Sequence, residues 1–231
     1  KTKIFCDIAD IKQISKFNRK SIVKGFTTNP SLIRKAGAKD YKSYCKKILR
    51  ICRSKPISFE VFADDKKNMK KQALIINQWG KNIYVKIPVV NSKGIFMGRL
   101  IKELNEMGVK LNITAVYTSR QTKNILSNVN KKTKIIISIF AGRMADTGKD
   151  PVPEFKRSLN YAKRFKNVEI LWASTREPYN YLQAKQLGCH IITIPPSIIE
   201  KILSFGKTFN HLTVNTVKGF LNDSKKSKFK I

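Results

Sequence analysis

The chain alternates between short apolar runs and longer segments whose apolar residues recur every three or four positions. Such a period indicates helices with one buried face, for example over residues 41–52 and 98–108. Eight β-like runs cover residues 3–9, 22–28, 56–62, 83–89, 109–116, 134–140, 168–174 and 190–195. Strand followed by helix, repeated eight times, predicts an α/β fold of the (β/α)8 TIM barrel type.

Turn and cap residues mark the ends of these elements. Gly80, Gly108 and Gly188 each precede a strand and indicate helix ends. Asn29 followed by Pro30 is typical of an N-cap and a first helical residue, and Ser197 is expected to cap a helix that begins near residue 198.

A further helix is expected over residues 209–221, after the eighth strand. The basic segment that follows it, 222–230, is expected to fray or to pack on a neighbouring subunit. We therefore predict one barrel domain over residues 1–231, with a C-terminal helix and basic tail over 207–231. A doubly wound open sheet is the alternative architecture, but residues 7–13 after the first strand lack the glycine-rich phosphate loop typical of that fold.

One lysine interrupts the strand-like run at residues 83–90. Ile83, Val85 and Ile87 alternate with Tyr84 and Lys86, so each set lies on one face of a strand that is apolar on both sides. Burial disfavours the charged ammonium form, and a neutral amine in an apolar pocket is the reagent for Schiff-base chemistry on a carbonyl. The alternative is a lysine that extends to solvent at the strand end or pairs with a carboxylate.

Polar residues occur at the C-terminal end of every expected strand, which is the end that carries the chemistry in a (β/α)8 barrel. They are Asp7, Thr27, Thr28, Asn29, Glu60, Lys86, Asn112, Thr114, Ser138, Ser174 and Thr193, with Arg143 and Arg176 just beyond two of the strands. Burying so many polar groups without partners would cost roughly 1–3 kcal/mol each. A polar ligand that occupies this rim explains the cluster better than chance does.

Composition adds a strong positive charge. The 231 residues include 47 Lys and Arg against 15 Asp and Glu, a formal net charge of +32. This excess suggests nucleic acid or another polyanion as a partner, but the basic residues are spread over all segments, and a bias in residue usage explains them as well. A positive field would in either case attract phosphorylated small molecules.

Cysteines and apolar runs bear on compartment and cofactors. The four cysteines form no CxxC pair, and with two histidines they offer no zinc ligand set. They indicate reduced core residues of a cytoplasmic protein. No run is long enough to span a membrane, no signal-peptide pattern occurs, and we expect no metal or organic cofactor.

Seven segments together resemble the transaldolase family. They are KIFCDIAD, GFTTNPSLI, FEVFADD, VKIP, LNITAVYT, ISIFAGRMAD and ILWASTRE, in family order and over nearly the whole chain. The resemblance implies a (β/α)8 barrel whose Schiff-base lysine is Lys86. It implies the short subgroup of transaldolases and fructose-6-phosphate aldolases, which often assemble as pentamers or decamers, and therefore a cytoplasmic homo-oligomer acting on sugar phosphates of the pentose phosphate pathway or of a specialised pathway.

The resemblance also assigns roles to the rim residues. Catalysis is expected from Lys86 as nucleophile, from Glu60 and Thr114 as holders of a proton-shuttling water, and from Asp7 as the base for the C4 hydroxyl. The substrate is expected to contact Thr28, Asn29, Asn112, Ser138, Phe140, Arg143, Ser174 and Arg176. Arg143 and Arg176, with Ser174, are expected to bind the phosphate, and Asp146 to hold Arg143 in place.

Two positions favour transaldolase over the aldolases of the subgroup. Transaldolases carry Glu on the third strand and Phe after the sixth-strand Ser, where the aldolases carry Gln and Tyr; this chain has Glu60 and Phe140. The expected reaction is transfer of a three-carbon dihydroxyacetone unit from a ketose phosphate to an aldehyde phosphate. The alternatives are cleavage that releases dihydroxyacetone, and a barrel without catalytic activity that binds polyanions through its charge; no RNA-recognition motif supports the latter, so no nucleic-acid partner is expected.

Overall fold

The computed structural model describes residues 1–231, and its central feature is a closed barrel of eight parallel strands. β1 pairs with β2 and, at the closure, with β8. The strands are β1 (Lys3–Asp7), β2 (Val23–Thr27), β3 (Ile57–Glu60), β4 (Ile83–Pro88), β5 (Leu111–Val116), β6 (Ile135–Phe140), β7 (Val168–Ala173) and β8 (Ile191–Ile194). The predicted (β/α)8 barrel is confirmed, with each strand ending up to two residues inside its expected range.

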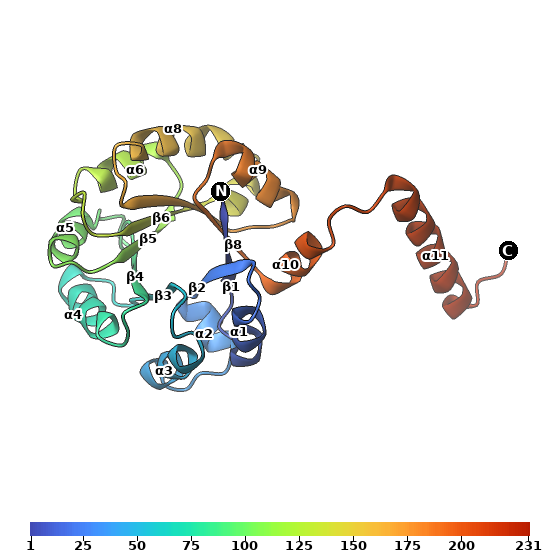
Figure 1. Cartoon of the computed structure of the whole chain (residues 1–231), viewed down its shortest axis with the longest axis horizontal. Helices are drawn as coiled ribbons and strands as arrows, with labels where there is room; N and C mark the ends of the chain where they lie inside the picture. Colours follow the sequence, from blue (N-terminus) through green and yellow to red (C-terminus); the bar gives the residue numbers. More distant parts are fainter. The chain divides into compact units, whose positions relative to one another are not determined.

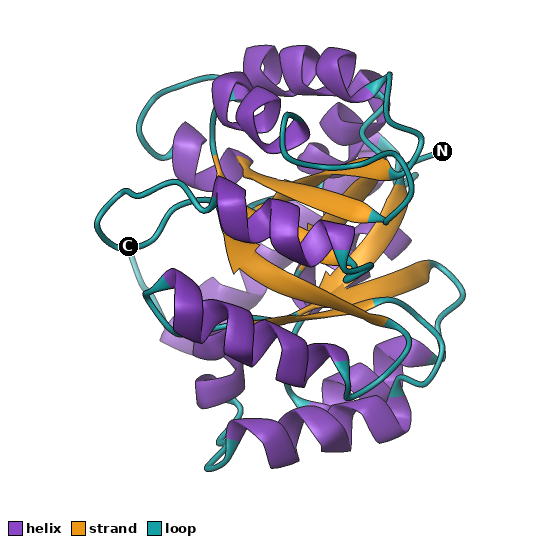
Figure 2. Cartoon of the chain, turned by 90° about the vertical axis from the view of Figure 1, so that its left-hand side faces the viewer, coloured by secondary structure: helices purple, strands orange, loops and turns teal.

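Helices surround the strands as an outer layer (Figures 1 and 2). They are α1 (Ile11–Asn18), α2 (Pro30–Lys35), α3 (Tyr41–Ile51), α4 (Lys66–Asn77), α5 (Gly98–Glu106), α6 (Ser119–Leu126), α7 (Ala141–Ala145), α8 (Val152–Ala162) and α9 (Tyr179–Leu187). Two more helices follow β8 in the chain, α10 (Pro196–Leu203) and α11 (Phe209–Ser227). Asp10, Asp40 and Asp65 cap three of them, because each carboxylate accepts a backbone N–H three residues on.

The expected cap at Asn29 is confirmed: its side chain accepts the N–H of Leu32, and Pro30 is the first helical residue. The expected start near residue 198 is wrong, because α10 already begins at Pro196, where a proline fits the first helical turn. The tail expected to fray from residue 222 is also partly wrong, since α11 continues to Ser227. Lys225 and Lys226 lie in its last turn, where cations favour the helix dipole.

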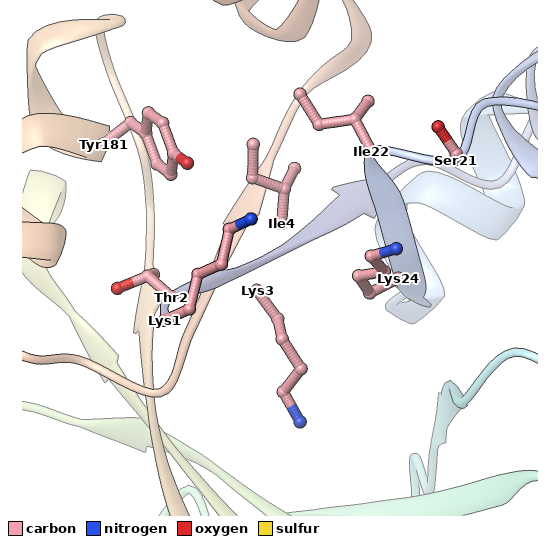
Figure 3. Close-up of a pocket in the computed structure, with 8 residues that line it drawn as sticks. All are labelled: Lys1, Thr2, Lys3, Ile4, Ser21, Ile22, Lys24 and Tyr181. Atoms are coloured by element: carbon pink, nitrogen blue, oxygen red, sulfur yellow. The ribbon is translucent and has the colours of Figure 1, made fainter.

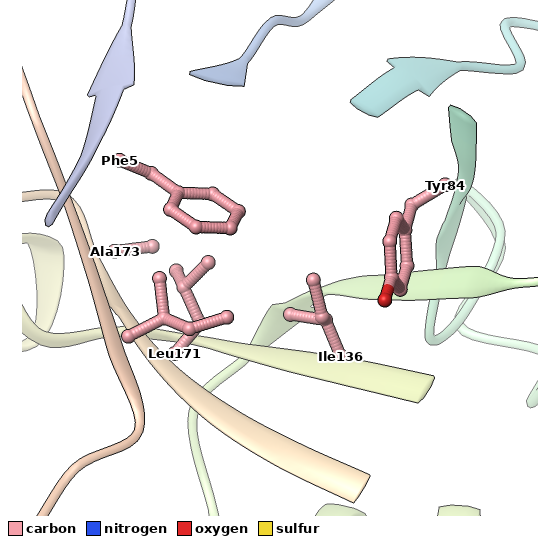
Figure 4. Close-up of a cluster of buried hydrophobic side chains, with 6 residues drawn as sticks. Phe5, Tyr84, Ile136, Leu171 and Ala173 are labelled. Carbon is pink, nitrogen blue, oxygen red and sulfur yellow. The ribbon is translucent and has the colours of Figure 1, made fainter. Parts of the chain in front are cut away.

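A compact apolar cluster lies inside the barrel, mostly toward the N-terminal ends of the strands. Phe5, Tyr84, Ile136, Leu171, Ala173 and Ile191 are all buried there. Figure 4 shows Phe5, Leu171 and Tyr84 extending from different strands into the space that the strands enclose. Gly25 makes room for Phe5, because a Cβ atom on Gly25 would lie 2.6 Å from the ring. This packed floor confines polar side chains to the other half of the barrel.

The residues form two compact units, Lys1–Ile199 and Glu200–Ile231. The first holds the barrel and α1–α9; the second holds the end of α10 and all of α11. Phe209 and Phe220 of α11 are 85% and 71% exposed. No helix combines the length and the apolar character that a membrane span requires.

Candidate active site

Lys86 projects into the interior of the barrel. It lies two residues after Tyr84 of the apolar floor, on the same face of β4, and is in register with Glu60 on β3 and Asn112 on β5. Only 6% of the residue is exposed. The alternative in which this lysine extends to solvent is therefore wrong, because the surrounding strands enclose its stem.

The ammonium nitrogen of Lys86 has two polar neighbours. Nζ donates a hydrogen bond of 3.0 Å to the main-chain oxygen of Thr28, and it lies 3.9 Å from Oε2 of Glu60. The second distance is too long for a direct hydrogen bond but suits a bridging water. The pairing with a carboxylate expected as an alternative is thus present, though as a loose contact that leaves the amine room to react.

Two carboxyl groups are drawn to higher pKa by their burial in this half of the barrel. Burial raises the pKa of Glu60, and the positive charge of Lys86 opposes the rise. Burial likewise raises the pKa of Asp7, against the charge of Lys86 and a 2.8 Å hydrogen bond from the Thr27 hydroxyl. Both groups are therefore suited to hold a proton that a neighbour releases.

A chain of side-chain hydrogen bonds crosses the barrel beside the lysine. The Asn112 amide donates to the Ser58 hydroxyl over 3.0 Å, and the Ser138 hydroxyl donates to the Asn112 carbonyl oxygen over 2.7 Å. These bonds fix the orientation of Asn112 and leave lone pairs on Ser138 for a ligand. Thr114, by contrast, has a buried hydroxyl with no hydrogen-bond partner.

An irregularity in β5 accompanies this orphaned hydroxyl. Ala115, which follows Thr114, has a φ of 60°, and the register with β6 shifts between Ile113 and Val116. An extra residue of this kind bends a strand and re-aims a side chain. An unpaired buried hydroxyl costs about 1–3 kcal/mol, so a bulge that leaves Thr114 unpaired indicates a group that hydrogen-bonds to a ligand or to water.

The ends of β6 and β7 bring two arginines together. The N–H of Arg143 donates to the Ser174 hydroxyl over 3.1 Å, and Ser174 has a φ of 58°. Gly142 allows this approach, because a Cβ there would lie 2.0 Å from the main-chain oxygen of Ser174. Both arginine side chains are exposed at this rim.

Asp146 pairs with Arg176, not with Arg143 as expected; the Nη2–Oδ2 distance is 2.7 Å. Asp146 directly follows α7 (Ala141–Ala145), and the turn after β7 brings the Arg176 guanidinium to its carboxylate. The Arg143 guanidinium is therefore not held by the Asp146 carboxylate.

The structure places the remaining expected residues around the same mouth. Phe140 packs on the edge of the apolar floor and its ring contacts Tyr117 at 5.8 Å between centroids. Thr28 donates its hydroxyl to the Ser58 carbonyl over 2.6 Å. The Asn29 oxygen is engaged as the cap of α2, so its amide nitrogen is the group left for a ligand.

Two contributors, Thr27 and Tyr41, were given no role from the sequence, although Thr27 was expected at the rim. Thr27 links Asp7 to Thr193, since its hydroxyl bonds both side chains. Its register opposite Asp7 on β2 was the available signal. Tyr41 contacts the backbone of Glu60, and nothing in the strand pattern points to a residue on α3.

Elsewhere the chain has a hollow of about 340 Å³ at the N-terminal ends of β1 and β2. Figure 3 shows Lys1, Lys3, Lys24 and Tyr181 around it. None of the expected site residues lines it, and barrels of this kind carry their chemistry at the opposite end. The mouth around Lys86 remains the candidate active site.

Comparisons with known proteins identify the family of the chain. The family model described as transaldolase/fructose-6-phosphate aldolase matches residues 4–231. A probable transaldolase of Methanococcus maripaludis strain S2 is 33% identical over 96% of each chain, and a probable transaldolase of Thermoanaerobacter sp. is 32% identical over 99% of this chain and 100% of its own.

Solved structures with little sequence identity share the fold. A 3-hexulose-6-phosphate synthase from Salmonella typhimurium aligns with a TM-score of 0.58 at 12% identity, covering 86% of this chain and 91% of its own. A monomeric dihydrodipicolinate synthase variant aligns with a TM-score of 0.61 at 9% identity, covering 84% and 69%. The family match over residues 4–231 and the relatives at 32–33% identity show the family: the chain belongs to the transaldolase/fructose-6-phosphate aldolase family.

Proposed function

We propose that the protein is a transaldolase that transfers a three-carbon dihydroxyacetone unit from a ketose phosphate to an aldehyde phosphate through a Schiff base on Lys86. The observation that carries the proposal is the buried amine of Lys86, with Glu60 3.9 Å away and Asp7 near enough to feel its charge, where burial raises the pKa of both carboxyl groups. Membership of the family supports the same reaction.

The first stage forms the imine. The Lys86 amine gives up its proton, attacks the ketone carbon and forms a carbinolamine, which then loses water. Glu60 can accept and return these protons because its carboxyl lies 3.9 Å from Nζ, a gap that a water bridges. The unpaired hydroxyl of Thr114 is suited to hold that water.

The second stage breaks the bond between C3 and C4. The protonated imine accepts the electron pair of that bond, while Asp7 takes the proton of the C4 hydroxyl. The aldehyde product leaves, and a three-carbon enamine stays on Lys86 until a second aldehyde phosphate adds to it by the reverse steps. Thr28, Asn29, Asn112 and Ser138 orient the fragment by hydrogen bonds, and Phe140 limits the access of water.

Replacing Glu60 by Gln is expected to slow imine formation by about 10²–10⁴-fold, the usual contribution of a general acid–base group. The Michaelis constant should change far less, since glutamine keeps the size and a hydrogen-bonding head. Rapid quenching with borohydride measures the rate of imine formation. Glu103→Gln on α5, which removes half-buried ion pairs with Lys66, Lys70 and Arg99, is the matched control; equal rates in the two variants would show that Glu60 moves no proton.

The phosphate binds at Arg143 and Arg176, with Ser174 adding a hydroxyl; guanidinium groups suit this ligand because they donate paired hydrogen bonds. Gly142→Ala would push Ser174 away and is expected to raise the Michaelis constant for a ketose phosphate about tenfold, the equivalent of one charge-assisted contact. Steady-state kinetics with phosphorylated and unphosphorylated ketoses test this. Gly219→Ala, where the added methyl meets nothing within 4 Å, is the control and should leave the Michaelis constants for both ketoses unchanged. If Gly142→Ala raised the Michaelis constant equally for both ketoses, the phosphate assignment would be contradicted.

Transfer and simple cleavage differ in the fate of the three-carbon unit. A transaldolase releases little free dihydroxyacetone and requires an acceptor aldehyde, whereas an aldolase releases it without one. A coupled assay for free dihydroxyacetone, with and without an aldehyde phosphate, decides between them. Glu60 and Phe140, which match the transaldolase side of the family resemblance, favour transfer.

The assembly and cellular setting stay predictions. A homo-oligomer would cover exposed apolar side chains such as Phe209 and Phe220 on α11, and sedimentation velocity would measure it. A cytoplasmic location, a role in the pentose phosphate pathway and a single-domain organisation with a C-terminal helix and tail remain likewise to be tested.

A further inference from the structure

Tyr41 binds both backbone polar groups of Glu60 with one hydroxyl. The hydroxyl donates to the Glu60 carbonyl oxygen over 2.8 Å and accepts the Glu60 N–H over 3.1 Å. Tyr41 is the first residue of α3, directly after the cap Asp40. A helix outside the barrel therefore holds the main chain of a residue whose side chain faces Lys86.

This contact stands where the strand ladder between β2 and β3 stops. The two strands pair only at Phe26 with Ile57 and at Thr27 with Ser58. In a parallel ladder continued by two residues, the N–H of Glu60 would bond to the Thr28 carbonyl oxygen. The Tyr41 hydroxyl takes that N–H instead, so the backbone group of Glu60 is satisfied without β2.

The interrupted ladder releases an acceptor for the lysine. The Thr28 carbonyl oxygen, no longer needed by β3, accepts the hydrogen bond from Nζ of Lys86 at 3.0 Å. The opposite edge of β3 stays regular, because the N–H of Val61 bonds to the Lys86 carbonyl. Because the Tyr41 hydroxyl takes the place of the Thr28 carbonyl as partner of the Glu60 N–H, both the Lys86 amine and the Glu60 carboxylate beside it are oriented.

The ring of Tyr41 is fixed independently of its hydroxyl. It contacts Phe62 edge-on at 5.1 Å and Trp79 at 6.3 Å between ring centroids. Burial raises the pKa of the Tyr41 phenol far above its ordinary value. The hydroxyl therefore keeps its proton at every working pH and acts as a permanent donor and acceptor for Glu60.

We propose that Tyr41 is a positioning residue for Schiff-base formation: by bonding the main chain of Glu60 it replaces a strand rung, and it frees the Thr28 carbonyl to orient the Lys86 amine. The inference rests on the proposed function, in that it assumes that Lys86 forms the imine. It adds a residue outside the barrel mouth that sets the rate of this step without touching the substrate.

Tyr41→Phe removes the hydroxyl and keeps the ring, so it tests the inference directly. We expect the rate of imine formation, measured by rapid borohydride quenching, to fall about tenfold, the effect of a 1.4 kcal/mol change in activation free energy. The Michaelis constant should stay within about twofold, since no substrate contact is lost. The acid limb of the rate profile should move to higher pH, because Glu60 drifts from the ammonium whose charge lowers its pKa.

Two controls separate positioning from general stability. Tyr44→Phe, one turn along α3, removes a comparable hydroxyl that donates to the Ala9 carbonyl over 2.7 Å, and it should leave the rate of imine formation unchanged. Phe62→Leu keeps the hydroxyl and the Trp79 contact that holds the Tyr41 ring, and leucine still packs on that ring, so it should also leave that rate unchanged. If either control slows imine formation as much as Tyr41→Phe, or if Tyr41→Phe has no effect, the inference is overturned. If the wild-type protein traps no substrate at Lys86, the proposed function itself fails.

Discussion

Replacing Lys86 by methionine is expected to abolish turnover, with a loss of at least about 10⁴-fold, because no other group can supply the nucleophilic amine. Methionine matches the length of the lysine stem, and the site is only 6% exposed, so the barrel should remain folded. We expect a melting temperature within about 5 °C of the wild type. Steady-state assays and calorimetry measure the two quantities.

Lys110→Met is the matched control for this variant. Lys110 precedes β5 at the other end of the barrel, where Nζ donates to the Lys81 carbonyl over 2.7 Å. Its loss should leave turnover intact. Residual activity of Lys86→Met above a hundredth of the wild type would mean that the amine is dispensable.

Replacing Asp7 by Asn is expected to block cleavage after the imine has formed. An amide cannot take the proton of the C4 hydroxyl, so cleavage should slow by about 10²–10⁴-fold. The intact ketose then accumulates on Lys86, and borohydride should trap the whole sugar instead of a three-carbon fragment. Mass spectrometry of the trapped protein distinguishes the two adducts.

Asp10→Asn is the control for Asp7. Asp10 caps α1 by accepting the Gln13 N–H, a role that asparagine fills equally well. Cleavage should proceed normally in that variant. A three-carbon adduct on Asp7→Asn would show that another group removes the proton.

Replacing Asp7 by Asn should also stabilise the fold at neutral pH. Burial raises the pKa of Asp7 in the folded state, so the folded protein keeps a proton that the unfolded chain loses near pH 4. Stability falls as pH rises through that window, and above it the charged carboxylate opposes folding. Asp7→Asn should therefore unfold at a higher temperature than the wild type at pH 7, with the difference vanishing below pH 4.

Much of the fold follows from local pattern. The run of residues around Lys86 is apolar on both faces, as a covered parallel strand requires, and β4 ends within one residue of the end expected from it. The ends of helices that make few tertiary contacts were harder to predict. Residues 222–227 carry no helix breaker, so α11 extends through a polar stretch that amphipathic periodicity alone assigns to a tail.

The candidate site divides in the same way. Residues on strand ends, such as Asp7, Glu60 and Lys86, were predictable because a closed parallel barrel brings all carboxyl ends to one rim. Ion pairs whose partners are placed by the conformation of a turn were not predictable. Asp146 binds Arg176, which lies 30 residues away, and not the nearby Arg143. Tyr41 was beyond prediction, since its role depends on where the ladder between β2 and β3 ends.

Borohydride trapping with a ketose phosphate, followed by peptide mapping, shows whether Lys86 is the nucleophile. We expect a single modified residue, Lys86, carrying the three-carbon unit of the donor. Modification at any other of the chain's lysines, or none at all, would contradict it.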